Sequence, residues 1–156
     1  MRCAIGSDDV GPLTEALLGE LERRGIALER FGALHDGSQA WASTGRAVGE
    51  AVADGRADVG IVCCWTGTGI SIAANKVGGV RAALCGDAET AVGARRWNDA
   101  NVLALSLRST SPAVGLEILT RFLDTAASDD PADRREIAAV EPERECRESH
   151  GPTLHR

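Results

Sequence analysis

The sequence has little of what metal centres and disulfide scaffolds require. Its 156 residues include three histidines, and His150 and His155 lie in a polar C-terminal stretch, which leaves only His35 in the body of the chain. A histidine-rich metal centre is therefore not expected. The five cysteines form an odd set without CxxC spacing, which fits neither a disulfide framework nor a zinc site. We expect these five residues to be reduced thiols: Cys3, Cys63, Cys64, Cys85 and Cys146.

Basic clusters and long apolar runs are also lacking. The formal net charge is −6 and the pI is near 5.1, which argues against a partner held by contacts to a phosphate backbone. No apolar run approaches the roughly 18 residues that span a bilayer. The segment Met1 to Ile5 lacks the long apolar stretch of a secretion signal. We therefore expect a cytoplasmic protein that binds neither nucleic acid nor membrane.

The chain does have enough apolar residues, 44% of the total, to fill the core of one domain. Short apolar segments alternate with amphipathic ones, and this alternation predicts a doubly wound, three-layer α/β/α fold with about five parallel strands. Strands are expected at 2–7, 26–31, 59–63, 80–84 and 102–105. Helices are expected from Pro12 to Gly25, from a cap at Thr44 to Asp54, at 72–76, from Asp87, at 112–125 and at 131–140. Residues 1–141 would form the domain, and 142–156 a disordered polar tail.

The ligand crevice of such a sheet lies outside the carboxyl ends of the strands. The loops expected there are Ser7–Asp9, Cys64–Gly69, Gly86–Asp87 and Ser106–Arg108. In the second loop, Gly67 and Gly69 allow backbone amides to turn toward an anion. The Cys64 thiol would lie near a helix N-terminus, where the positive end of the helix dipole stabilises a thiolate. The alternative is a buried, unreactive cysteine, and that is the interpretation for Cys3, Cys63 and Cys85.

Other residues of these loops also have two interpretations. The Cys64 loop lacks the Gly-Lys-Ser/Thr ending of a P-loop and the third glycine of a dinucleotide fingerprint, so neither nucleotide is indicated. Asp8 or Asp9 could hold sugar hydroxyls or move a proton, whereas one of them could equally form a cap or an Asx-turn. Trp65 could stack on a sugar or act as a hydrophobic plug.

Three segments, 60–76, 80–85 and 97–103, resemble the family of B-type ribose-5-phosphate isomerases and galactose-6-phosphate isomerases. The most specific is Thr-Gly-Thr-Gly-Ile-Ser-Ile-Ala-Ala-Asn-Lys at 66–76, and the resemblance extends from the first strand to about Glu141. It implies a Rossmann-like fold and dimers or tetramers that share their sites between subunits. It also implies cofactor-free interconversion of aldose and ketose phosphates through a cis-enediol.

The resemblance assigns roles to individual residues. Cys64 falls on the position of the base that moves a proton between C1 and C2, and the amides of Gly67, Thr68 and Gly69 would stabilise the enediolate oxygen. Thr66 and Asn98 match polar site positions, and Asp8 matches a substrate-binding aspartate. Arg108, Arg134 and Arg135 are the candidates for holding phosphate. Asn98 precedes a strand, so it would reach a crevice most easily across a subunit interface.

The chain departs from the family pattern around this site. Asp9 and Trp97 stand where the family usually has histidines, Trp65 replaces a glycine, and Trp41 takes an aromatic position. Asp129, Asp130 and Asp133 lie where basic residues commonly bind phosphate. Loss of the imidazoles removes a proton shuttle for ring opening. We therefore expect a sugar phosphate substrate or, alternatively, an open-chain, short or unphosphorylated sugar. A non-catalytic sugar-binding protein with the same fold is the other alternative.

Overall fold

The computed structural model describes residues 1–141, so the tail predicted at 142–156 lies outside the described residues. Five parallel strands form one sheet in the order β2-β1-β3-β5-β4. Their bounds are β1 Arg2–Ser7, β2 Ala27–Gly32, β3 Val59–Cys64, β4 Ala82–Leu84 and β5 Val102–Ser106. The chain runs outward from β1 to β2 and then crosses to β3 on the other side of β1. This order confirms the predicted doubly wound sheet.

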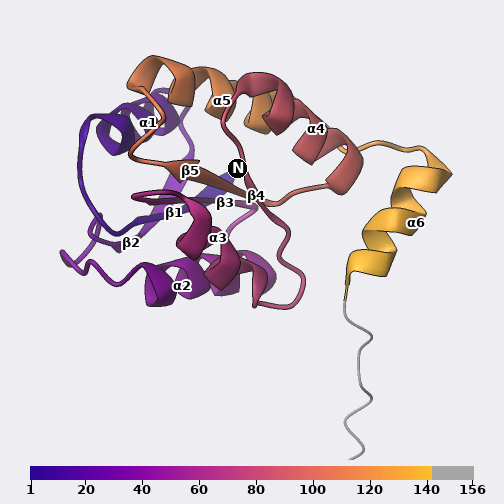
Figure 1. The fold of residues 1–156 in the computed structure, drawn as a ribbon, viewed down its shortest axis with the longest axis horizontal. Helices are drawn as coiled ribbons and strands as arrows, with labels where there is room; N and C mark the ends of the chain where they lie inside the picture. Colours follow the sequence, from indigo (N-terminus) through magenta and orange to yellow (C-terminus); the bar gives the residue numbers. More distant parts are fainter. Residues whose placement is uncertain (142–156) are drawn as a thin grey trace, which may run out of the picture.

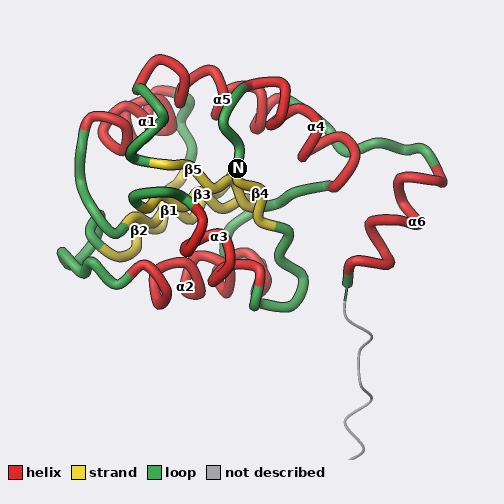
Figure 2. Tube along the Cα trace, viewed as in Figure 1, coloured by secondary structure: helices red, strands yellow, loops and turns green. Residues whose placement is uncertain are grey.

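Helices cover both faces of the sheet and make three layers. Their bounds are α1 Pro12–Arg23, α2 Trp41–Ala53, α3 Thr68–Asn75, α4 Ala88–Asn98, α5 Pro112–Asp124 and α6 Pro131–Val140. Helices α2 and α3 lie on one face and α1, α4 and α5 on the other (Figure 1). Figure 2 shows the strands as a middle layer between these two sets. Helix α6 stands beside the body, next to the end of α4.

The central strand β3 holds the two halves of the core together. All six of its residues are buried, as its continuous apolar run predicted. Ile61 and Cys63 join the cluster under α1 and α5, whereas Val62 and Cys64 join the cluster under α2 and α3. Alternation along one strand therefore fills both sides of the sheet.

Two helices begin earlier than the sequence predicted. The prediction that Thr44 caps a helix is wrong, because α2 begins at Trp41 and Thr44 is buried in its first turn. The buried Thr44 side chain packs closely against the glycines of neighbouring strands, and a Cβ on Gly6 would lie 2.6 Å from its methyl group. Helix α3 begins at Thr68 rather than Ile72, because Gly67 is its N-cap in the left-handed region.

The fourth strand is shorter than predicted. It begins at Ala82 rather than Val80, because the amides of the two preceding residues donate to groups outside the sheet ladder. The Val80 amide donates to the Val77 carbonyl at 3.1 Å, and the Arg81 amide donates to Asn101 Oδ1 at 2.8 Å. These bonds replace ladder bonds at the start of the edge strand.

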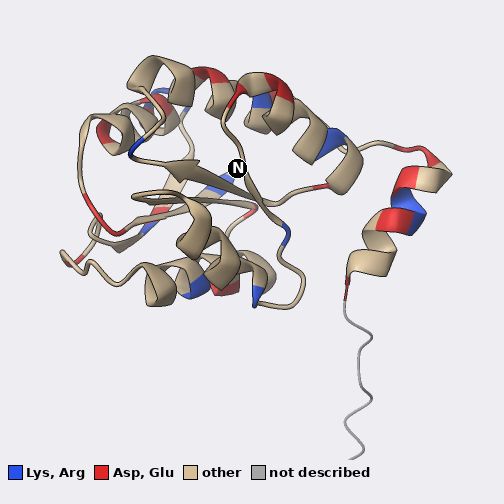
Figure 3. Ribbon diagram, viewed as in Figure 1, with Lys and Arg blue, Asp and Glu red and all other residues tan. Residues whose placement is uncertain are grey.

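Residues of both charge signs are interspersed along the helices and loops (Figure 3). Within residues 1–141, no helix combines the length and apolar character needed to cross a membrane.

The close packing at Gly6 gives a first prediction. Gly6→Ala should lower the free energy of unfolding by about 1–3 kcal/mol, because the added methyl would meet Thr44 and Val48 within 3 Å. Gly19→Ala is the matched control, since its exposed site on α1 has no neighbour within 4 Å of the added carbon. The control should stabilise the protein by about 0.5–1 kcal/mol. Chemical denaturation of both variants measures the difference, and equal effects would contradict this packing.

Candidate active site

The carboxyl ends of β1 and β3 meet at the point where the strand order reverses. Asp8 follows β1, and its amide donates to the Cys63 carbonyl at 3.3 Å. A cavity of about 270 Å³ opens here, lined by Asp8, Asp9, Gln39, Trp65 and Leu107. The structure therefore brings the first two predicted loops together at one crevice.

The turn after Cys64 is fixed by its own backbone. The Cys64 carbonyl accepts hydrogen bonds from the amides of Gly67 at 3.1 Å and Leu107 at 3.0 Å. Gly67 has φ 75°, and a Cβ there would lie 2.5 Å from Leu84 Cδ1 and 2.9 Å from the Leu105 carbonyl. Only glycine satisfies both constraints without strain. Cys64 itself is 5% exposed, so its thiol has limited access to the crevice.

Helix α3 presents amide groups at this turn. The first amides of an α-helix have no partner within the helix, and among the described residues α3 also has no side-chain cap. The amides of Thr68 and Gly69 are therefore available to an oxyanion, together with the positive end of the helix dipole. Two hydroxyls lie next to them, because Thr66 Oγ1 and Thr68 Oγ1 are hydrogen-bonded at 2.7 Å. The ring of Trp41 covers Gly69.

The backbone of Trp65 is held by hydrogen bonds, whereas its side chain is exposed. Its carbonyl accepts hydrogen bonds from Ser106 Oγ at 2.9 Å and from the Arg108 amide at 3.0 Å. The side chain is 64% exposed, which rules out a plug of this subunit's own core. The same bonds place Arg108 at the Cys64 edge of the sheet, as predicted from the end of β5.

The two adjacent aspartates have different roles in the turn after β1. Asp9 Oδ1 accepts from the Val10 amide at 2.8 Å, and the Asp9 carbonyl accepts from Ser7 Oγ at 2.7 Å. Within the described residues, Asp8 Oδ1 is buried and has no hydrogen-bond partner. Burial raises the pKa of the Asp8 carboxyl, and the charge of Asp9 raises it further, whereas the backbone amides of Asp8 and Trp65 oppose the shift. Asp9 therefore shapes the turn, whereas Asp8 lines the crevice and keeps one carboxyl oxygen without a partner among the described residues.

Three predicted site residues lie away from this crevice. Trp97 and Asn98 end α4 at the opposite edge of the sheet, where they line a cavity of about 450 Å³ with Arg81, Ile137 and other residues. Arg134 lies on α6 and is paired with Asp129. One subunit thus divides the predicted site into a Cys64 group and a second group at the α4–α6 side.

Gln39 and Leu107 line the crevice but were not predicted. Leu107 belongs to a loop that the strand-end rule selected, so topology could have found it. Gln39 lies in the loop before α2, where no local pattern distinguishes it. In the described part of the chain, no group of three or more metal-ligating side chains could hold a metal ion.

Comparisons with known proteins identify the class that this fold and site define, an aldose–ketose isomerase. Ribose-5-phosphate isomerase B of Escherichia coli is 38% identical over 124 residues, which cover 79% of this chain and 80% of that protein. D-erythrulose-4-phosphate isomerase of Pectobacterium atrosepticum is 34% identical over 126 residues, which cover 80% of this chain and 83% of that protein.

A solved structure extends the likeness to three dimensions. Ribose-5-phosphate isomerase B of Clostridium thermocellum has a TM-score of 0.83 and 38% identity, and the match covers 90% of this chain and 95% of that one. The family described as Ribose/Galactose Isomerase matches residues 3–140. The chain belongs to this family.

Stability measurements test the environment of Asp8. The pKa of the Asp8 carboxyl is raised in the folded state. At acid pH the carboxyl is therefore protonated in both the folded and the unfolded state and does not lower the stability of the protein. As pH rises past the ordinary aspartate pKa, the unfolded state ionises first and the wild type loses stability until the folded carboxyl ionises as well. Asp8→Asn should therefore melt at a higher temperature than the wild type near neutral pH, by about 1–3 °C, and at the same temperature in acid.

Asp87→Asn is a control with the opposite sign. Hydrogen bonds from Thr90 lower the pKa of this helix cap, so its charge stabilises the folded state once pH exceeds the ordinary value. The control should lose stability relative to the wild type as pH rises. Thermal melts across the acid range compare the three proteins, and a constant offset for Asp8→Asn would refute the proposed burial effect.

Proposed function

We propose that this chain isomerises a short or open-chain sugar phosphate through a cis-enediol intermediate, with Cys64 as the base. The observation that carries the proposal is the arrangement at the switch point. There, the buried Cys64 thiol and the uncapped amides of α3 flank the loop that brings Trp65 beside Asp8 in the crevice, and within the described residues Asp8 Oδ1 has no hydrogen-bond partner. This is the set of groups that a proton transfer beside a carbonyl requires.

The thiol and the amides each have a defined step in the proposed reaction. The Cys64 thiolate removes the proton from C2 of the aldose, the C–H electron pair forms the C1–C2 double bond, and the negative charge develops on O1. The amides of Thr68 and Gly69 stabilise that charge. A proton then moves from O2 to O1, and the Cys64 thiol returns its proton to C1. The product is the ketose, and the step needs no oxidant, reductant or cofactor.

The departures around the crevice favour a substrate that needs no ring opening. Asp9 and Trp97 replace the imidazoles that would move protons near neutral pH. A tetrose that carries phosphate on O4 has no hydroxyl left to close a five-membered ring, so it stays open. The Pectobacterium atrosepticum relative is named for such a substrate, D-erythrulose 4-phosphate. We infer that this chain also prefers a four-carbon sugar phosphate over a cyclic pentose phosphate.

A complete site requires a second copy of the chain. Trp97, Asn98 and Arg134 lie on the α4–α6 side, away from Cys64 in the same subunit. Two large apolar side chains, Trp97 and Val140, are also exposed on this side. Exposed apolar patches of this kind typically mark protein interfaces. In a two-fold dimer, each α4–α6 side can serve the Cys64 crevice of the partner.

Substitution of the two adjacent cysteines tests the base. Cys64→Ala should lower kcat by about 10²–10⁴-fold and leave substrate affinity nearly unchanged, because a general base contributes to the transition state. Cys63→Ala is the matched control. Burial raises the pKa of Cys63 to about 12, so this thiol stays protonated and only fills the core.

The measurement is exchange of the substrate C1 or C2 proton in deuterated water, which reports enediol formation even where net conversion is slow. Wild type and Cys63→Ala should exchange, and Cys64→Ala should not. Exchange by Cys64→Ala at the wild-type rate would contradict the assignment. Binding without exchange by the wild type would indicate a non-catalytic sugar-binding protein.

A substrate panel with one restored histidine tests the chain length. The wild type should have a higher kcat/KM for tetrose 4-phosphates than for ribose 5-phosphate. Trp97→His should raise the rate on ribose 5-phosphate by about tenfold or more, as expected for a restored general acid–base group, with little gain on the tetrose. Trp41→Phe, which keeps an aromatic ring over Gly69, serves as the control for a changed tryptophan. Equal wild-type rates on both substrates would refute the preference.

A further inference from the structure

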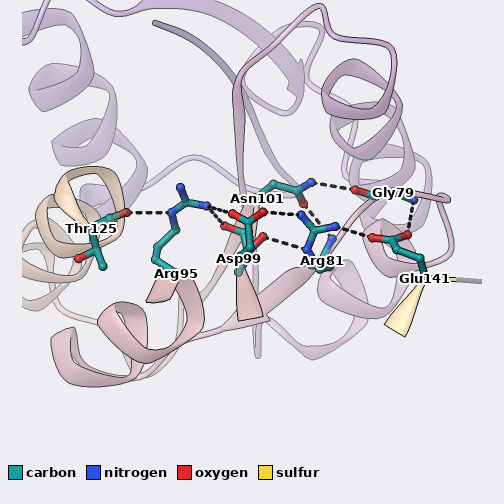
Figure 4. A network of polar contacts seen from close by, with 8 residues as sticks. Gly79, Arg81, Arg95, Asp99, Asn101, Thr125 and Glu141 are labelled. Carbon is teal, nitrogen blue, oxygen red and sulfur yellow. Dashed lines mark hydrogen bonds and ion pairs between the residues drawn. The ribbon is translucent and has the colours of Figure 1, made fainter. Parts of the chain in front are cut away.

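A network of charged side chains joins the end of α4 to the end of α6 (Figure 4). Arg81, at the start of the edge strand, occupies its centre. Its Nε donates to the Asp99 carbonyl at 2.9 Å and its Nη2 to Asp99 Oδ2 at 3.1 Å. Its Nη1 donates to Glu141 Oε1. The Arg81 side chain is only 17% exposed, whereas its partners Asp99 and Glu141 are 39% and 33% exposed.

Asp99 is held in an unusual backbone conformation. It caps α4 with φ 43° and ψ 45°, and it is the one non-glycine residue at positive φ in residues 1–141. Aspartate tolerates this region better than most residues, but glycine would fit it more easily. The carboxylate explains why aspartate rather than glycine occupies this position, because it also accepts a hydrogen bond from Arg95 Nη1 at 3.2 Å. Two arginines therefore fix the turn that directly follows Trp97 and Asn98.

Helix α6 depends on polar bonds for its position. None of its residues is buried, so apolar packing contributes little. At its start, the Ser128 amide donates to the Arg96 carbonyl at 2.8 Å. At its end, Glu141 pairs with Arg81 and also accepts from the Gly79 amide at 3.2 Å. Both ends of the helix are thus tied to the elements that surround Asn98.

The end of α4 and helix α6 face each other across the cavity of about 450 Å³. Trp97 and Asn98 line one part of it, and Glu136 and Ile137 of α6 line another, with Arg81 also in the lining. A shift of α6 would therefore change the surroundings of Asn98 and the position of Arg134 together.

We propose that Arg81 is a positioning residue of the isomerase, because it pairs with Asp99 and Glu141 and so joins the Trp97–Asn98 turn and α6 into one rigid arm. The arm, defined as residues 97–99 and 131–141 with Arg81, enters the neighbouring subunit's Cys64 crevice as a unit. This inference rests on the proposed function and on its shared site. It assigns a separate effect to each carboxylate, since Asp99 holds the Asn98 turn and Glu141 holds the helix that carries Arg134.

Two substitutions, each of which replaces a carboxylate by an uncharged amide of the same shape, separate these effects. Glu141→Gln keeps the shape of the side chain and should raise KM for a phosphorylated sugar by about threefold to tenfold, with kcat within about twofold, because a charge-assisted bond that positions Arg134 is weakened. Asp99→Asn should lower kcat by about tenfold or more, because misplacement of a site residue reduces turnover. Glu29→Gln, which breaks the exposed Arg56–Glu29 pair elsewhere on the surface, should change neither.

Mixed dimers test whether the arm acts across the interface. Asp99→Asn and Cys64→Ala are each impaired alone, but a mixed dimer combines one intact Cys64 crevice with one intact arm. Co-expression should restore about a quarter of wild-type activity for random pairing in a two-fold dimer. If Asp99→Asn does not fold, Asp99→Gly keeps the backbone conformation and removes both ion pairs.

The outcomes distinguish this inference from the proposed function. If Glu141→Gln and Asp99→Asn lose only thermal stability, with kcat and KM equal to those of Glu29→Gln, the network merely supports the fold and the inference is overturned. Absence of recovery in mixed dimers also overturns it. Proton exchange by Cys64→Ala at the wild-type rate, or none by the wild type, removes the proposed function and this inference with it.

Discussion

Burial of β3 on both of its faces is the constraint on which the rest of the structure depends. A strand covered by helices on each side has to lie in the middle of a parallel sheet, and its carboxyl end has to open at the switch point beside β1. The Cys64 loop therefore gains its location from the core rather than from its own residues. Gly67 and Gly69 determine only the conformation of the turn from β3 into α3.

The same constraint separates the predicted site residues into two groups within one chain. Parallel strands send all of their carboxyl ends to one edge of the sheet, and the residues that precede strands go to the other edge. Asn98 precedes β5 and Cys64 ends β3, so the fold itself holds them apart. The proposed association of two copies would bring the two groups together, and the exposed side chains of Trp97 and Val140 are consistent with it.

The sequence predicted the features that arise from local pattern. Apolar runs located the five strands, and strand ends located Asp8, Cys64 and Arg108 at one edge of the sheet. The start of α3 was missed because two glycines resemble a loop, although Gly67 is in fact a cap. Thr44 was misread as a cap because its burial depends on contacts with Gly6 and Gly32, which are distant in sequence. The Arg81 network could not be predicted, since its partners lie 18 and 60 residues away along the chain.

The anchoring of Trp65 has a consequence for how this family can diversify. Its carbonyl is bonded to Ser106 and Arg108, whereas its side chain projects from the loop. Replacement of that side chain removes neither of these bonds, because residue 65 takes part in them through its carbonyl. In the proposed site, the side chain at position 65 can therefore change without altering the backbone turn that follows Cys64, so this position can adjust which sugars fit.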